Sequence, residues 1–177
     1  MSESTQPISL PANNSIKNHV IASMGLGLIP IPLVDVSALT ATQLSMLQKL
    51  CMLYDVPFEE GDLKPLLTSL ASAALPVMGI IGVSSLVKAI PGIGTLGGSA
   101  SLSVIAGAMT YALGQTFAIH FAAGGNLENL DIKQAKVFFK SEIDHGKKFV
   151  QSLRDEFKMA KEEAAAAQNK ASTEAID

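Results

Sequence analysis

The strongest constraint on this chain is a long stretch that is almost without charge. Between Pro65 and Ala123 the one side chain with a formal charge is Lys88, whereas residues 124–177 carry nine Lys and Arg and ten Asp and Glu. Soluble domains have about 25% charged residues, and this chain has 16%. The sequence therefore joins an apolar middle, typical of helices buried in protein or lipid, to a water-soluble C-terminal region.

Two uncharged runs lie in this stretch, residues 66–87 and residues 96–123. At about 1.5 Å per helical residue, each run is long enough to cross a hydrocarbon core about 30 Å thick. Proline and glycines lie between them, where proline ends a helix and glycine permits a tight reversal. We expect an apolar helical hairpin over about residues 64–123. Its expected turn residues are Pro91, Gly92, Gly94 and Gly97.

Small residues recur at four-residue spacing along the second run, and such ridges let two helices approach closely. They fit a hairpin packed in lipid, and they also fit a hairpin buried inside a soluble helical bundle. We favour insertion into a membrane or deep association with one and keep the soluble bundle as the alternative. The expected helix-packing residues are Ser103, Gly107, Ala108, Ala112, Gly114 and Ala118.

Helical periodicity outside the hairpin predicts an all-α fold with amphipathic helices. Residues 1–14 are expected to form a flexible polar leader, because they contain two prolines and show no periodicity. A helical membrane-associated module should follow over residues 15–125. Its first helix can be capped by Asn14 or Ser15, and its second should end before Pro57.

A long amphipathic helix is expected over residues 126–168, opened by Asp131 and followed by a flexible tail over residues 169–177. Its apolar side chains recur at steps of three and four, which approximates a coiled-coil seam. The seam has two interpretations, a helix docked on its own domain or an interface with a partner or a second copy. The residues of the expected oligomer or partner face are Phe139, Ile143, Val150, Leu153 and Phe157.

The sequence lacks the surrounding residues that motifs for catalysis or cofactor binding require. Residues 92–97 match G-x-G-x-x-G, but a dinucleotide site needs a strand before the glycines and an acidic residue about 20 positions later. Neither condition holds, because Pro91 precedes the motif and no Asp or Glu lies between Asp62 and Glu128. A phosphate-binding G-x-x-x-x-G-K-[ST] loop does not occur in the sequence. We therefore expect a non-enzymatic protein without a cofactor.

Metal binding and general nucleic-acid binding are also disfavoured. The three histidines, His19, His120 and His145, lie in separate segments, and Cys51 is the only cysteine. This excludes an internal disulfide and a cysteine zinc cluster, and we expect no metal site. A net charge of −3 does not indicate a nucleic-acid partner.

Basic residues flank the hairpin on both sides, with Lys64 before it and Lys133 and Lys136 after it. The positive-inside rule then places both termini in the cytoplasm, although Lys88 at the far turn opposes this orientation. The polar N-terminus lacks the pattern of a signal peptide. We expect the cytoplasmic (inner) membrane as the location.

The order and spacing of three segments resemble a known family. They are Gly25-Leu-Gly-Leu-Ile-Pro-Ile-Pro-Leu-Val-Asp35, Ser85-Leu-Val-Lys-Ala-Ile-Pro-Gly-Ile-Gly94 and Thr110-Tyr-Ala-Leu-Gly114. The family is the bacterial domain of unknown function 697, with YcjF-like inner-membrane proteins as relatives, and the likeness covers about residues 16–125. It implies an all-helical membrane-associated module without an established catalytic motif.

Modules of that family often follow a P-loop GTPase domain, whereas only a 14-residue leader precedes the module in this sequence. A GTPase is therefore expected as a separate partner. Three functions stay open: a membrane-associated scaffold that self-assembles or binds such a partner, a membrane-remodelling or pore-forming protein that inserts on oligomerisation, and a soluble helical homo-oligomer. The partners expected are the lipid bilayer and further copies of the chain.

Overall fold

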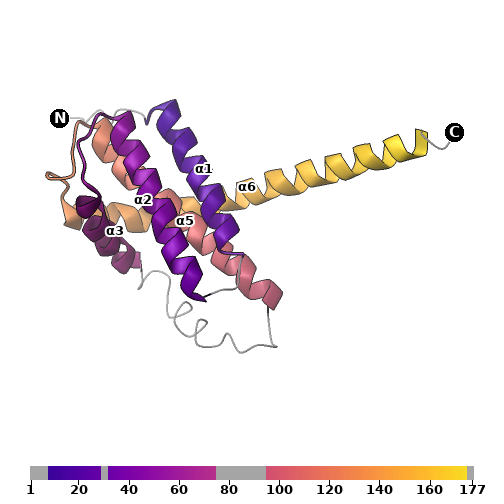
Figure 1. Cartoon of the computed structure of the whole chain (residues 1–177), viewed down its shortest axis with the longest axis horizontal. Coiled ribbons are helices and arrows are strands. Elements are labelled where there is room, and N and C mark those ends of the chain that lie inside the picture. The colour runs from indigo at the N-terminus through magenta and orange to yellow at the C-terminus, as the bar shows by residue number, and fades with distance from the viewer. Residues whose placement is uncertain (1–7, 29–31, 75–94, 175–177) are drawn as a thin grey trace.

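The computed structural model describes residues 8–28, 32–74 and 95–174, and these residues form five helices and no strand (Figure 1). The expected all-α class is confirmed. The helices are α1 (Leu10–Leu26), α2 (Pro32–Leu53), α3 (Glu60–Ala74), α5 (Thr95–Ala122) and α6 (Ile132–Glu174).

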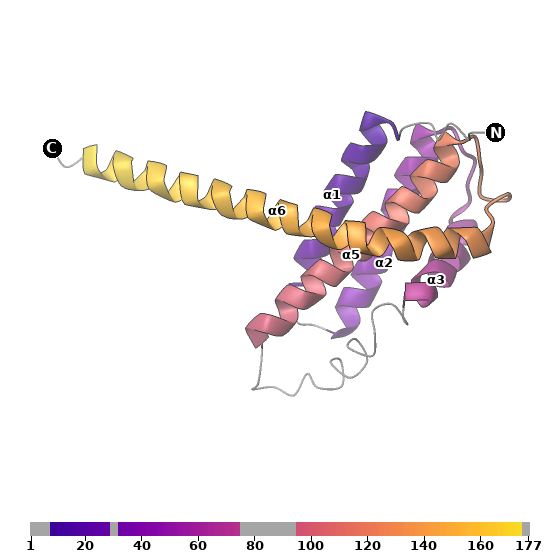
Figure 2. The same cartoon turned by 180° about the vertical axis from the view of Figure 1, so that it is seen from behind.

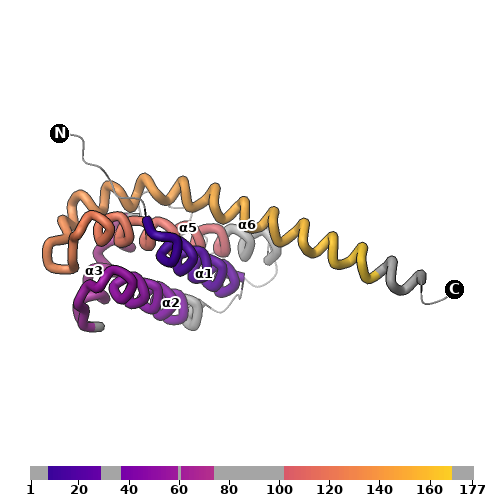
Figure 3. Tube along the Cα trace, turned by 90° about the horizontal axis from the view of Figure 1, so that it is seen from above, coloured from indigo at the N-terminus to yellow at the C-terminus, as the bar shows by residue number. Residues whose placement is uncertain are grey.

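The helices are layered around α5. Helices α1, α2 and α5 run along one another, and α6 crosses behind them, as the view from behind shows (Figure 2). Seen from above, α6 lies on one side of α5, while α1 and α2 lie on the other (Figure 3). The most extensive packing is that of α5 against α6, followed by α1 against α5. The most apolar helix is therefore the centre of the fold.

Helix α5 is shielded from solvent from Ser103 onward. No residue from Ser103 to Ala122 is exposed, and Leu113 and Phe117 are fully buried. By length and composition, Leu102–Ala122 could cross a membrane, with a mean hydropathy of 1.4, yet 61% of this window is buried inside the protein. The core helix of a soluble bundle has the same properties.

Glycine permits the closest helix approaches. A Cβ added to Gly146 of α6 would lie 2.7 Å from the carbonyl oxygen of Ala108 in α5. A Cβ on Gly107 would lie 2.7 Å from Cγ2 of Val150, and one on Gly114 would lie 2.8 Å from Cγ1 of Ile16. The other expected helix-packing residues, Ser103, Ala108, Ala112 and Ala118, are also buried.

A small polar network joins three helices inside the core. The Gln43 amide of α2 donates to the Thr110 hydroxyl of α5 (3.2 Å), which donates to the Ser23 hydroxyl of α1 (2.8 Å). All three side chains are buried. Because an unpaired polar group inside a core is costly, these bonds favour one alignment of α1, α2 and α5.

The helix starts follow local capping chemistry. Helix α1 begins at Leu10, earlier than the expected Asn14 or Ser15, because the Ser9 side chain accepts from the Ala12 N–H and proline occupies the first turn. Residues 10–14 of the expected leader therefore belong to this helix. The expected start of α6 is confirmed, since Asp131 Oδ1 accepts from the N–H groups of Lys133 (2.8 Å) and Gln134 (3.2 Å). This helix extends to Glu174, past the predicted residue 168.

The expected hairpin is described only in part. Its second arm is α5, and its first arm is described as far as Ala74 of α3. Pro91, Gly92 and Gly94 lie outside the described residues. Gly97, also expected in the turn, lies instead in the first turn of α5, because that helix begins at Thr95.

The glycine contact between α5 and α6 makes a stability prediction. Gly146→Ala should destabilise the fold by about 1–3 kcal/mol, because the added methyl group meets the backbone of Ala108, which cannot turn aside. As the matched control, Gly25→Ala adds the same methyl where nothing lies within 4 Å, and should stabilise α1 by about 0.5–1 kcal/mol. Urea denaturation followed by circular dichroism measures the stability of both variants. Equal effects of the two substitutions would contradict the close contact at Gly146.

Candidate membrane interface

The bundle has one end that is nearly free of charge. Helices α1 and α3 end there, and α2 and α5 begin there, at the lower end in Figure 1. In the sequence, residues 20–34 have no charge, and residues 65–127 have one, on Lys88. We call this the apolar end; Asp35, in the first turn of α2, is the charge nearest to it in that helix. The fold therefore gathers separate uncharged segments at one pole.

The charged loops that follow α2 and α5 lie away from the apolar end. Asp55 follows the end of α2 at the opposite end, whereas the start of α3, with Glu59, Asp62 and Lys64, and the start of α6, after Glu128 and Asp131, lie along one side of the bundle nearer its middle. Such a division suits a protein with one pole in an apolar medium and the other in water.

Exposed apolar side chains lie at both ends of the bundle. Leu10 at the start of α1 and Met52 near the end of α2 are exposed at the end opposite the apolar one, and other exposed apolar residues lie near the apolar end or on α6. Leu28 is 56% exposed, Leu102 41% and Phe157 49%. Leu28 and Phe157 border a groove of about 430 Å³ between α1, α5 and α6. The groove is lined by Ile21, Met24, Gly25, Leu28, Ser103, Arg154 and Phe157. Large exposed apolar side chains that lie together are typical of protein or membrane contacts.

The predicted oligomer or partner face requires correction. Phe139, Ile143, Val150 and Leu153 are at most 1% exposed, because they pack against the rest of the chain. The alternative interpretation, a helix docked on its own domain, holds as far as Leu153. Of the predicted face, Phe157 alone is accessible. Every residue from Arg154 to Gln168 is exposed, and beyond Phe157, which lines the groove, α6 projects alone (Figure 1).

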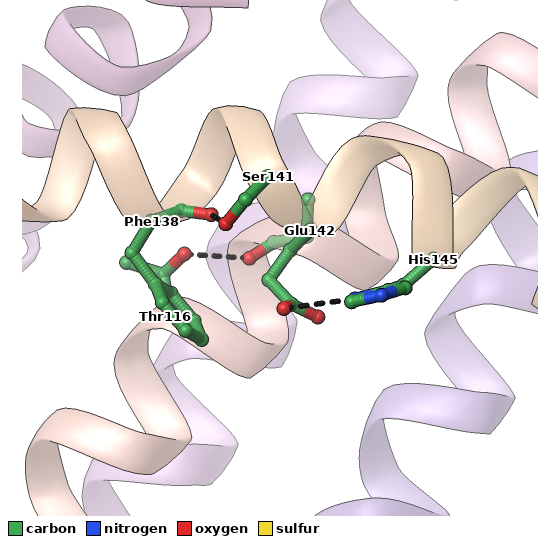
Figure 4. Close-up of polar contacts among 6 residues, drawn as sticks. Thr116, Phe138, Ser141, Glu142 and His145 are labelled. Carbon is green, nitrogen blue, oxygen red and sulfur yellow. Dashed lines mark hydrogen bonds and ion pairs between the residues drawn. The ribbon is translucent and has the colours of Figure 1, made fainter.

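Polar groups at the α5–α6 crossing bond within their own helices (Figure 4). The Thr116 hydroxyl donates to the Ala112 carbonyl (2.7 Å), and the Ser141 hydroxyl donates to the Phe138 carbonyl (2.7 Å). Nδ1 of His145 lies 3.0 Å from Oε1 of Glu142. Since these groups satisfy one another locally, they do not converge as an acid, a base and a nucleophile around one point.

His120 closes the connection between α5 and α6. Its Nε2 lies 2.8 Å from the Asn126 carbonyl oxygen and 3.0 Å from Oδ1 of Asn129, and its ring packs against Gly125. These bonds give the histidine a structural role. Within the described ranges, no group of three His, Cys, Asp or Glu residues is placed to hold a metal ion.

Cys51 has the environment of an inert core thiol. It is fully buried in α2, and burial raises the pKa of the thiol to about 11. A raised pKa lowers the thiolate fraction at neutral pH, and the thiolate is the reactive form.

Comparison with known proteins assigns the family. The family described as Domain of unknown function (DUF697) matches residues 3–144, most of the chain. The chain belongs to this family. The match is wider than the 16–125 range of the resemblance and includes the first part of α6.

A curated relative is "Magnetosome membrane protein 22" of Magnetospirillum gryphiswaldense. It is 38% identical over 158 residues, which cover 89% of this chain and 78% of the relative. No solved structure matches the chain.

Sequence reasoning missed the apolar groove. Met24, Ser103 and Arg154 belong to α1, α5 and α6, and only the docking of α6 brings them together in the groove. A partial signal was Gly27, where an added Cβ would lie 2.7 Å from Cα of Ser103. A glycine at the end of one helix gives no indication of which helix approaches it.

Thiol labelling tests the burial of the core. At pH 8, Cys51 should react with a maleimide at least about 100-fold more slowly in the folded chain than in urea, because burial both blocks access and raises the pKa. Below its raised pKa the thiol keeps its proton, so the folded rate should rise as the pH approaches 11. Cys51 is the only cysteine, so the signal has one source. Equal rates in both states would contradict the packing.

Proposed function

We propose that this chain is a non-enzymatic, membrane-associated scaffold. Its apolar end and uncharged hairpin insert into or dock on the cytoplasmic membrane, with both termini in the cytoplasm. The observation that carries the proposal is the separation of charge along the bundle, since Leu28 and Leu102 are exposed at one pole and the charged loops after α2 and α5 lie away from it. Exposing such an apolar pole to water is unfavourable, and lipid removes that cost.

The relative supports a membrane location, because its name describes a membrane protein and it aligns with 89% of this chain. The absence of convergent chemistry among the described residues agrees with a scaffold. A scaffold also needs a surface for other proteins.

The projecting half of α6 supplies such a surface. It is rich in Ala, Glu and Lys, residues that favour a helix without tertiary contacts, and Lys158 pairs with Glu162 one turn later (4.0 Å). We infer a semi-rigid arm that reaches a second copy of the chain or a separate P-loop GTPase. The GTPase follows from the resemblance of the family and not from contacts in this chain.

A charge placed in the uncharged run tests membrane insertion. Ile80 lies near the middle of residues 66–87. Ile80→Arg should reduce the membrane-bound fraction by about 100-fold, because a charge at mid-membrane costs about 2.5–3.5 kcal/mol. The matched control is Ser152→Arg, which adds the same charge at an exposed position of α6 and should leave fractionation unchanged. The measurement is the amount of each variant in the membrane fraction, separated with and without detergent.

The wild-type chain also decides between the main proposal and the soluble bundle. A chain that stays in the soluble fraction without detergent, ignores added liposomes and forms an assembly of defined mass is the soluble homo-oligomer. If the chain is recovered with the membranes and only detergent releases it, membrane insertion is supported.

A pore-forming or membrane-remodelling protein is the second candidate. It is favoured by one observation: α5 can span a membrane, yet α6 and α1 cover it, so insertion would require α6 to leave. Such an opening should make Cys51 reactive and release dye from liposomes. Stable binding with Cys51 protected and no leakage would reject this candidate in favour of the scaffold.

A further inference from the structure

Helix α6 carries a row of basic side chains along one face. Successive members are separated by four, seven, seven, four and three residues. At 3.6 residues per turn these steps return to the same side of a helix, so the row runs straight for about 38 Å. The members of the basic row are Lys136, Lys140, Lys147, Arg154, Lys158 and Lys161.

Most of the row is available to a partner. Arg154 and Lys161 are exposed, and neither makes an ion pair with a described residue. Three acidic residues flank the row and neutralise it in part: Asp144 pairs with Lys147 (2.8 Å), Glu162 pairs with Lys158 (4.0 Å), and Asp155 follows Arg154 directly in the sequence. Lys147 also lowers the pKa of Asp144 by donating a hydrogen bond to its carboxylate. An excess of unpaired positive charge remains.

Contacts with α1 show which way the row faces. Glu156, on the opposite side of α6 from Arg154, reaches Lys17 in the first half of α1 (3.4 Å). Arg154 instead lines the groove with Gly25 and Leu28, at the end of α1. Because α1 runs toward the apolar end of the bundle, the basic row faces that end as well.

The crossing of α6 sets the distance between the basic row and the apolar end. Helix α6 runs across α1 and α5 near the middle of the bundle and rises away from the apolar end toward its C-terminus (Figure 1). Arg154 shares the groove with Ser103, and α5 continues from there for eight residues to Thr95, about 12 Å. That depth fits an apolar element in the outer hydrocarbon layer with cations at the level of the phosphates.

We propose that the basic row binds the headgroups of anionic phospholipids while the apolar end enters the same leaflet. The complementary charges and the shared direction of the two surfaces select an anionic membrane as the partner. This inference rests on the proposed function and adds the class of lipid and the residues that recognise it. Each basic residue near an anionic surface strengthens binding about five-fold.

Vesicle binding of the full chain tests the proposal. The row variant, Arg154→Gln with Lys161→Gln, is compared with the control variant, Lys49→Gln with Lys148→Gln, which removes the same charge from exposed positions outside the row. Vesicles contain phosphatidylcholine alone or mixed with phosphatidylglycerol. Circular dichroism and the protection of Cys51 verify that each variant is folded.

For the mixed vesicles, we expect the row variant to lose about 25-fold in affinity and the control variant to change much less. All three chains should bind neutral vesicles equally, because the apolar end is unchanged. Added salt should remove the preference for mixed vesicles. Inorganic phosphate at constant ionic strength should not release the chain, since the ligand is the lipid surface.

Three outcomes would overturn the inference while wild-type binding to neutral vesicles preserves the proposed function. One is an equal loss in both variants, which indicates general charge attraction. Another is release by inorganic phosphate. The last is unchanged vesicle binding by a row variant that binds duplex DNA or an acidic polypeptide more weakly than wild type, which assigns the row to another partner. If the wild-type chain binds neither kind of vesicle, the proposed function fails too.

Discussion

The crossing of α6 over α5 is the contact on which the rest of the structure depends. Gly146 brings α6 onto the backbone of Ala108, and Phe139, Ile143 and Val150 then fill the space beside it. Dispersion and burial of apolar surface supply the attraction, and the absence of a side chain at Gly146 sets the spacing. With α6 in place, α5 is covered on the face that α1 and α2 leave open, and the uncharged helix becomes a core.

That crossing also decides how charge is arranged around the molecule. It places one face of α6 toward the apolar end, where Leu28 and Leu102 are exposed, and leaves the helix beyond Phe157 projecting into solvent. A single helix thus carries three surfaces: an apolar face for its own core, a basic row beside it, and an exposed arm. The proposed membrane and partner contacts both depend on α6 being docked.

Strong local signals made the fold class and the family predictable. The all-α class followed from periodicity, the start of α6 followed from Asp131 as a cap, and the likeness to the family was correct. The partner face was wrong because a stripe such as Phe139 to Leu153 has the same spacing whether it meets its own domain or another chain. Capping by Ser9 was missed because the leader has no apolar periodicity to follow.

The sequence by itself determined that this chain has an apolar middle and a charged end, because charge and hydropathy belong to the residues. It also determined where α6 begins, since a cap acts within a few positions. Only the tertiary structure decided that α5 lies under α6, that Met24, Ser103 and Arg154 line one groove, and that Phe157 is left accessible. These facts depend on contacts between residues far apart in the chain, for which local patterns hold no information.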